Sequence, residues 1–303
     1  DVLGAETNAP PKPDGGHGIK GAIMGLVMKR AGAATPSADR ITLLRDADGD
    51  GRAEVRQVFL SGLHSPFGMA LVGDTFYVGN TDGVVAFPYT PGATQISAPA
   101  RRLCTFKPGG HWTRSLLPSR DGRRLYVGVG SLSNIGEHGL AAEEGRACIY
   151  ELDLATHHSR IYAAGLRNPV GLAWDASGRA LWAVVNERDE LGSDLVPDYL
   201  TAVRDGAFYG WPYSWYGNHV DDRVQPPKPE LVASAVVPDY ALGSHVAPLG
   251  LAASTTSALP DLLAGRVPAG AGAASAPASA ASVQGMFVGL HGSWNRRPRS
   301  GYK

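Results

Sequence analysis

Histidine and arginine side chains recur at one position of a phrase that the sequence repeats. The copies are residues 63–68 (LHSPFG), residues 166–171 (LRNPVG) and residues 242–252 around His245. A hidden fourth copy overlays residues 116–127 on residues 172–183 and places His111 on Arg167. A neutral imidazole accepts a proton near pH 7, and a guanidinium binds a carboxylate through two hydrogen bonds. These residue types suit proton transfer beside a bound anion.

Each copy of the phrase predicts a β-hairpin. An apolar strand is followed by a polar turn with Gly and Asp or Ser, and then by a second strand such as residues 125–129. Successive copies lie roughly 45 to 80 residues apart, and a four-stranded propeller blade needs about 40 to 50 residues. The repeat therefore predicts a β-propeller. We expect the equivalent positions His64, His111, Arg167 and His245 to converge at one end of its central channel.

Composition agrees with a turn-rich globular domain. The 303 residues include 39 Gly and 22 Pro, and 44% are hydrophobic. The 28 basic and 28 acidic residues cancel, so no global field favours nucleic acid, and an anionic ligand must be held locally. No apolar run approaches the about 20 residues of a membrane span, and the start has no signal-peptide pattern.

The chain is expected to be one propeller domain over residues 1–303. It begins as if in the middle of a strand, at residues 1–8, and ends abruptly, so the sequence predicts a ring truncated at both ends. Within it, residues 263–282 are almost wholly Ala, Gly, Ser and Pro. This composition predicts a flexible surface loop.

Two further features leave alternatives open. Cys104 and Cys148 have no metal-ligand spacing, and two buried free thiols are favoured over a disulfide. Asp46, Asp48 and Asp50 alternate as in a calcium loop, but the twelfth position is not the Glu that an EF-hand needs. A turn between strands, with or without a weakly bound ion, remains.

Five blocks of the sequence, in order, resemble the soluble-type quinoprotein sugar dehydrogenases, and in particular their sorbosone dehydrogenase branch. The blocks are residues 110–113 (GHWT), 165–173 (GLRNPVGLA), 186–194 (NERDELGSD), 208–213 (FYGWPY) and 289–296 (GLHGSWNR). The resemblance implies a six-bladed propeller of four-stranded antiparallel blades with pyrroloquinoline quinone and a calcium ion over the channel mouth. It also implies oxidation of an aldose or sugar aldehyde by hydride transfer to the quinone, an unidentified electron acceptor, and a periplasmic or extracellular location.

The cofactor is a planar tricarboxylate, so its site needs forked cationic donors. The resemblance makes Arg167 and Asn168 cofactor ligands and places Asn186 on the cofactor. A surface ion pair for Arg167, a turn role for Asn168 and a strand-closing role for Asn186 are the structural alternatives. The repeat places His245 at the same channel entrance, in the wall of the cofactor pocket. The last resembling block would bring Asn295 and Arg296 to the cofactor, with Arg297 and Arg299 as nearby alternatives.

The resemblance also implies where calcium binds. The ion on the cofactor is held by successive main-chain carbonyls, which map onto Glu187 and Arg188. In some relatives a second, structural calcium uses a carboxylate that maps onto Asp194 and a carbonyl near Tyr209. Calcium prefers such oxygen ligands.

His111 is the expected general base. A hydroxyl must lose its proton as hydride leaves the same carbon, and an imidazole titrating near pH 7 suits this task. The residue before it is Gly110, where the glucose-oxidising branch has Asp, so an orienting carboxylate must come from elsewhere or be absent. The alternative is an inactive propeller that serves as a binding module. The joint presence of His111, Arg167, Asn168 and a second basic group favours the enzyme.

Overall fold

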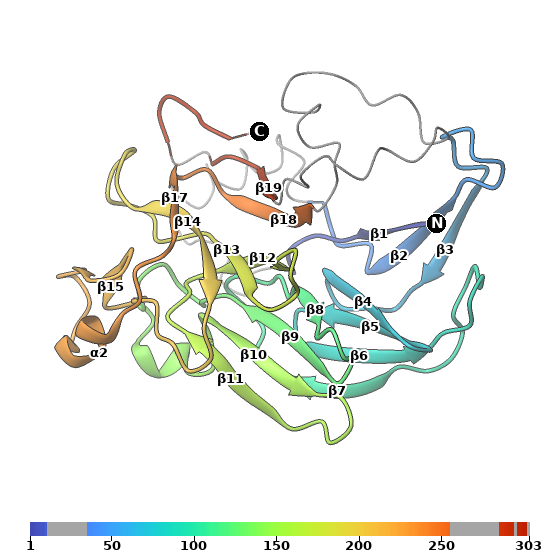
Figure 1. Cartoon of the computed structure of the whole chain (residues 1–303), viewed down its shortest axis with the longest axis horizontal. Coiled ribbons are helices and arrows are strands. Elements are labelled where there is room, and N and C mark those ends of the chain that lie inside the picture. The colour runs from blue at the N-terminus through green and yellow to red at the C-terminus, as the bar shows by residue number, and fades with distance from the viewer. Residues whose placement is uncertain (11–34, 255–284, 294–295, 302–303) are drawn as a thin grey trace.

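The computed structural model describes residues 1–10, 35–254, 285–293 and 296–301, and these residues form antiparallel β-sheets that fan out around a common centre (Figure 1). The first sheet contains β1 (Val2–Glu6), β2 (Arg40–Arg45) and β3 (Val55–Leu60). The second contains β4 (Gly68–Val72), β5 (Thr75–Asn80), β6 (Gly83–Pro88) and β7 (Arg101–Thr105). The third contains β8 (Leu116–Pro118), β9 (Arg124–Val129), β10 (Cys148–Asp153) and β11 (Ser159–Ala164).

The fourth sheet contains β12 (Pro169–Trp174), β13 (Leu181–Val185), β14 (Pro197–Val203) and β17 (Tyr240–Ser244). Two pairs complete the described strands: β15 (Ser214–Trp215) with β16 (His219–Val220), and β18 (Pro248–Ser254) with β19 (Gly285–Leu290). The short helices are η1 (Leu140–Glu143) and α2 (Pro229–Ser234). The predicted all-β class with four-stranded antiparallel sheets is confirmed, and the number of six blades stays a prediction.

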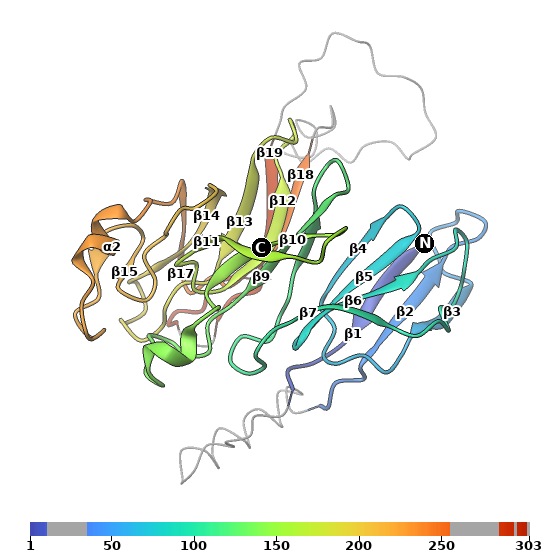
Figure 2. The same cartoon turned by 90° about the horizontal axis from the view of Figure 1, so that it is seen from below.

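The hydrophobic core lies between the faces of successive sheets, which stand side by side in Figure 2. Strand periodicity explains this arrangement, because neighbouring side chains point to opposite faces. On β5, Phe76 and Val78 enter the cluster shared with the first sheet, whereas Tyr77 enters the cluster shared with the third. On β9, Leu125 packs toward the second sheet and Tyr126 toward the fourth. The first four sheets therefore pack on one another as successive blades do in a propeller.

The glycine of the repeated phrase lets neighbouring inner strands approach closely. A Cβ at Gly68 would lie 2.4 Å from the Arg114 carbonyl oxygen, just before β8. A Cβ at Gly171 would lie 2.9 Å from the Leu251 backbone nitrogen of β18. Real Cβ atoms do not approach other atoms so closely, so the repeat preserves glycine where one blade meets the next.

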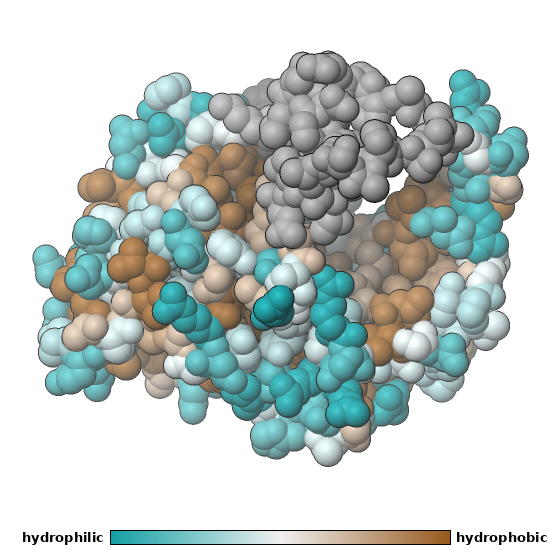
Figure 3. All heavy atoms as spheres, in the orientation of Figure 1, coloured by the Kyte–Doolittle hydropathy of each residue, from teal (hydrophilic) through white to brown (hydrophobic). Residues whose placement is uncertain are grey.

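The outer edges of the blades face solvent. In Figure 3 the lower rim, where β7 and β11 lie, is largely hydrophilic. No helix among the described residues is both long enough and apolar enough to cross a membrane. Cys104 and Cys148 are free thiols, as favoured from the sequence; Cys148 is fully buried as predicted, whereas Cys104 is only partly buried. The segment predicted as a flexible loop, residues 263–282, lies outside the described residues.

Candidate functional site

A ladder of hydrogen bonds joins three blades at one end of their inner strands. The His111 backbone donates to the Ser131 carbonyl at 3.0 Å, and the Ser131 backbone donates to the Arg167 carbonyl at 2.8 Å. The Asn186 backbone donates to the Asn168 carbonyl at 3.0 Å, and its side chain donates to the Pro248 carbonyl at 2.9 Å. His111, Arg167, Asn168 and Asn186 are therefore brought together.

Arg167 is buried at 5% exposure and already oriented. Its Nη1 donates to the Glu187 carbonyl at 2.6 Å, and its Nη2 donates to the Asp189 carboxylate at 3.0 Å. Asn134 accepts twice more, from Nη2 through its side-chain oxygen at 3.0 Å and from Nε through its carbonyl at 3.3 Å. The guanidinium thus lies against the predicted calcium loop. The guanidinium itself is buried, and its ion-pair partner, the Asp189 side chain, is 37% exposed.

His245 joins the same cluster through Asp189. The His245 Nδ1 lies 3.3 Å from Asp189 Oδ1, while Oδ2 of that carboxylate accepts from Arg167. The other ring nitrogen of His245 lies 2.9 Å from the Gly192 carbonyl oxygen. The Asp189 carboxylate therefore bridges two of the predicted cofactor contacts.

The ring of His111 contacts Ser131 through its Nδ1 atom. Its Nδ1 lies 3.0 Å from the Ser131 carbonyl oxygen and 3.1 Å from the Ser131 hydroxyl. A carbonyl only accepts, so Nδ1 carries the proton and Nε2 holds the free lone pair. The orienting group that the sequence left open is thus the carbonyl of Ser131.

The expected titration of His111 near pH 7 is wrong. Burial, followed by the positive charge of Arg167, lowers the pKa of His111 to about 3. Both causes disfavour the charged imidazolium. His111 is therefore neutral, with a free lone pair, over the whole physiological range.

Two buried arginines hold the loop that carries His111. Arg146 donates to the Lys107, Pro108 and Gly109 carbonyls at 2.6 to 3.1 Å. Arg114 donates to the His111 carbonyl at 2.8 Å.

On the facing loop, the Glu143 carboxylate at the end of η1 accepts from the backbone of Leu132 and Ser133. Hydrogen bonds from charged side chains to the main chain therefore hold the two loops that carry His111 and Ser131.

Asn168 lies directly beside His111. A Cβ added at Gly130 would lie 2.3 Å from the Asn168 side-chain oxygen and 2.5 Å from the His111 Cβ. Gly130, which follows β9, is therefore the residue that lets these two side chains meet. The Asn168 side-chain oxygen is buried and has no hydrogen-bond partner among the described residues.

Other buried polar atoms of the predicted site also lack partners among the described residues. They are Glu187 Oε2, Arg188 Nε and Nη2, and Arg296 Nε. Buried polar groups are normally hydrogen-bonded, but unpartnered atoms also lie outside the predicted site, at Thr7, Thr81, Asp82, Arg114, Arg146 and Tyr199, so these atoms do not by themselves mark a ligand site. Because the Nε and Nη2 hydrogens of Arg167 are on Asn134 and Asp189 and one Nη1 hydrogen is on Glu187, one Nη1 hydrogen remains, among the described contacts, for a cofactor carboxylate. With the Asn168 amide and nearby main-chain carbonyls, this donor fits a planar carboxylated cofactor with a calcium ion.

The loop after β13 is tied down by a buried carboxylate that the sequence did not single out. Asp198 accepts from the Glu187 backbone and from the Ala247 backbone, both at 2.8 Å. Burial raises the pKa of Asp198 to about 6 and that of Glu187 to about 8. The Glu187 carbonyl faces Arg167, whereas the Arg188 side chain pairs with buried Asp221 at 2.6 Å.

The remaining predicted residues lie apart from this centre or at its edge. Arg296 donates to the Ser193 and Ser244 carbonyls and pairs with Asp194 at 3.1 Å. Asp194 is 83% exposed, and Tyr209 is buried in the core with its hydroxyl on the Ala202 carbonyl. No hydrogen bond or ion pair of the described residues links these last two. Asn295 lies outside the described residues.

In its own blade, His64 occupies the position equivalent to Arg167, but its side chain contacts Asp82 and does not join the cluster of His111 and Arg167. Its carbonyl accepts from the Thr81 backbone at 3.0 Å. Its half-exposed ring lies 3.5 Å from the Asp82 carboxylate. The repeat therefore places the backbone of His64 correctly and leaves its ring in a structural contact.

The acidic loop between β2 and β3 is a capped turn. Asp46 accepts from the Gly49 and Gly51 backbones at 2.7 and 2.9 Å. Together with Asp48, Asp50 and Glu54 it forms an exposed group whose ligand atoms lie within 4.8 Å of one another. These contacts are those of a turn between strands.

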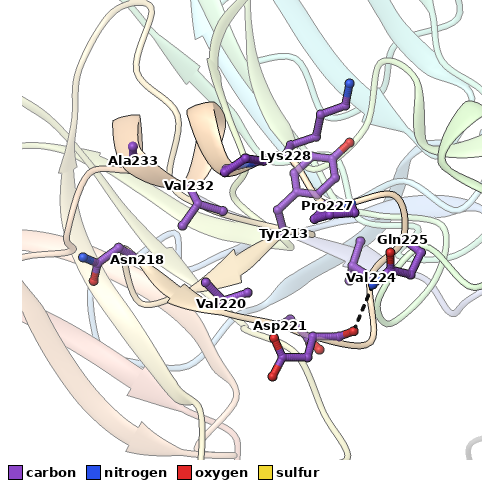
Figure 4. A pocket seen from close by; sticks show the side chains of 12 residues that line it. Tyr213, Asn218, Val220, Asp221, Val224, Gln225, Pro227, Lys228, Val232 and Ala233 are labelled. Atoms are coloured by element: carbon purple, nitrogen blue, oxygen red, sulfur yellow. Dashed lines mark hydrogen bonds between the residues drawn. The ribbon is translucent and has the colours of Figure 1, made fainter.

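A cavity of about 550 Å³ lies between the β15–β16 hairpin and α2. Figure 4 shows its largely apolar lining, which includes Tyr213, Val220, Val224 and Val232, with Lys228 at one side. Asp221, which pairs with Arg188, is its link to the loop after β13. The converging polar residues are not among its lining, so this cavity is separate from them.

Sequence reasoning missed four residues that support the centre: Ser131, Asn134, Asp189 and Asp198. Asp189 and Asp198 stand next to or inside a recognised block, and their acidic type was a usable signal. Ser131 and Asn134 lie in an insertion after β9 with no motif, so only the fold shows their contacts.

Comparison with known proteins places this geometry in a family. The TrAA12-like family profile matches residues 40–199, just over half of the chain. An uncharacterized protein of Borreliella burgdorferi is 25% identical over 195 residues, which cover 64% of this chain and 45% of that protein. The chain thus spans less than half of the length of that relative.

Solved structures share the fold. The holo form of the pyranose dehydrogenase PQQ domain from Coprinopsis cinerea has a TM-score of 0.67 at 21% identity, covering 88% of this chain and 70% of that one. The calcium structure of the Trichoderma reesei Carbohydrate-Active Enzymes family AA12 protein has a TM-score of 0.66 at 19% identity, covering 88% and 72%. With the family match over residues 40–199, the chain belongs to the TrAA12-like family.

Proposed function

We propose that this protein is a quinoprotein oxidoreductase that oxidises an aldose or sugar aldehyde. The observation that carries the proposal is the bridge made by Ser131. It joins the backbone of Arg167 to the backbone of His111 and orients the His111 ring. A cation suited to a carboxylated cofactor and a neutral base thus lie at one end of the inner strands.

The roles of the residues follow from their surroundings. Arg167 binds a carboxylate of the cofactor, and Asn168 offers an amide beside it. His111 accepts the hydroxyl proton of the substrate at Nε2, because Nδ1 is already committed to Ser131. Pyrroloquinoline quinone, when bound with calcium, supplies the acceptor for the hydride that leaves the same carbon.

The finer features are part of the same proposal. The carbonyls of Glu187 and Arg188 would hold calcium, with His245, Asn186 and Arg296 lining the cofactor. Asp194 and Tyr209 would serve a second calcium. The sorbosone dehydrogenase branch, a periplasmic or extracellular location and a separate electron acceptor follow from the blocks that resemble that branch.

Reconstitution tests the proposal. The protein is incubated with pyrroloquinoline quinone and calcium, the quinone absorbance is scanned, and sugars and aldehydes are offered with an artificial acceptor. We expect a shifted quinone spectrum and its reduction by at least one aldose or sugar aldehyde. A spectrum that does not change at any calcium concentration would favour a propeller that only binds other molecules.

A further inference from the structure

Asn134 contacts three separate parts of the molecule from a loop with no recognised motif. Its side-chain oxygen accepts from Arg167 Nη2 at 3.0 Å, and its carbonyl accepts from Arg167 Nε at 3.3 Å. The same carbonyl accepts from the indole of Trp211 at 2.9 Å. One residue of the third blade thus reaches the start of the inner strand of the fourth blade and the segment between β14 and the outermost strand β17.

The amide of Asn134 also pairs with the main chain of Asp189. The Asp189 backbone donates to the Asn134 side-chain oxygen at 2.8 Å, and the Asn134 side-chain nitrogen donates to the Asp189 carbonyl at 3.0 Å. The Asp189 carboxylate in turn accepts from Arg167. Asn134 therefore fixes the guanidinium and its counter-ion in one arrangement.

We propose that Asn134 is a positioning residue that holds Arg167 against the loop of residues 187–190. A free arginine side chain has many rotamers, and ordering it during binding costs affinity. Asn134 removes this cost before any ligand arrives. The consequence for cofactor affinity rests on the proposed function, whereas the effect on Arg167 itself does not.

The test compares Asn134→Ala with Asn218→Ala, which removes an exposed amide from the turn between β15 and β16. Affinity for pyrroloquinoline quinone with calcium is measured by titration, on the whole chain. We expect Asn134→Ala to weaken binding about 10-fold, as one ordered side chain is lost, and Asn218→Ala to leave it unchanged. Equal affinities in all three proteins would overturn the proposal.

A double-mutant cycle separates positioning from a general structural effect. On an Arg167→Ala background, Asn134→Ala should change the affinity less than about 2-fold, since its partner is gone. Full additivity of the two effects would show that Asn134 does not act through Arg167. If Asn134→Ala fails to fold, Asn134→Leu replaces it, because leucine has a similar size but can neither accept from Arg167 nor donate to the Asp189 carbonyl.

A third measurement is independent of the cofactor. Solvent exchange of the Arg167 Nη2 protons, followed by NMR and assigned with Arg167→Lys, should be faster in Asn134→Ala than in the parent chain, because this substitution removes the side-chain oxygen that accepts from Nη2. If the parent does not bind the quinone, the proposed function fails and this exchange rate alone decides the role of Asn134. An unchanged rate would overturn it.

Discussion

Arg167 is buried, and each nitrogen of its guanidinium group donates a hydrogen bond. Both features determine the expected effect of replacing it on cofactor binding. Arg167→Ala is expected to weaken quinone binding by about 2 to 4 kcal/mol, because a buried carboxylate would lose a charge-assisted partner. Titration of pyrroloquinoline quinone measures this change. The matched control is Arg179→Ala, an exposed arginine in the turn between β12 and β13, which should bind like the parent. Undiminished affinity of Arg167→Ala would place the cofactor elsewhere.

His111 is expected to govern turnover rather than affinity. His111→Gln keeps the size and polarity of the side chain but removes the basic Nε2. Turnover should therefore fall about 100-fold to 10,000-fold, the usual contribution of general acid–base catalysis, while quinone affinity hardly changes. Single-turnover reduction of the bound quinone by sugar is the measurement. An unaltered rate would exclude His111 as the base and leave His245 as the next to test.

The lowered pKa of His111 gives a prediction about pH. With a pKa of about 3, the imidazole stays neutral from pH 8 down to pH 5, so the turnover profile should lack an acidic limb near pH 6.5. Stability behaves differently, because the unfolded chain binds a proton at His111 below about pH 6.5 and the folded chain does not. The free energy of unfolding of the parent relative to that of His111→Gln should thus fall as pH drops from about 6.5 toward 3, whereas the raised pKa values of buried Glu187 and Asp198 act in the opposite direction in both proteins. Parallel denaturant titrations of both proteins would show whether it does.

At the scale of the strands, the glycine of the repeated phrase allows the inner strands of neighbouring blades to pack closely. Gly171→Ala would push a methyl group against the Leu251 backbone of β18, so we expect a loss of about 1 to 3 kcal/mol in the free energy of unfolding. Urea denaturation measures it. Gly4→Ala in β1 is the control, since its Cβ meets nothing within 4 Å and should cost within about 1 kcal/mol. Equal stability of the two variants would mean that the blades can shift apart without cost.

At the scale of the whole molecule, the proposed site gathers residues from three blades, so a ligand there should strengthen the whole fold. A ligand at about 100 times its dissociation constant stabilises the folded state by about 2.7 kcal/mol. Quinone with calcium should therefore raise the melting temperature of the parent. Chelating the calcium should remove most of that increase, and Arg167→Ala should show little of it. A melting temperature indifferent to both ligands would argue against a site that bridges the blades.

The repeat can be found from the sequence alone. It was enough to predict the β-hairpins, the all-β propeller class of fold and the equivalent positions of His111 and Arg167 in their blades. These predictions were possible because each signal lies within a few residues and recurs in each copy of the repeat. The signals are the alternation of side chains along a strand, the glycines of the turns and the glycine at which neighbouring blades approach closely. The resemblance between short blocks added the chemistry those positions would serve.

Only the tertiary structure decided how the site residues are partnered and charged. The pKa of His111 depends on burial and on Arg167 from another blade, so no local pattern could give its value. Asn134 meets Asp189 across 55 residues of chain, and Asp198 ties the Glu187 backbone to that of Ala247. Such contacts depend on how neighbouring blades are placed, which a sequence motif does not record.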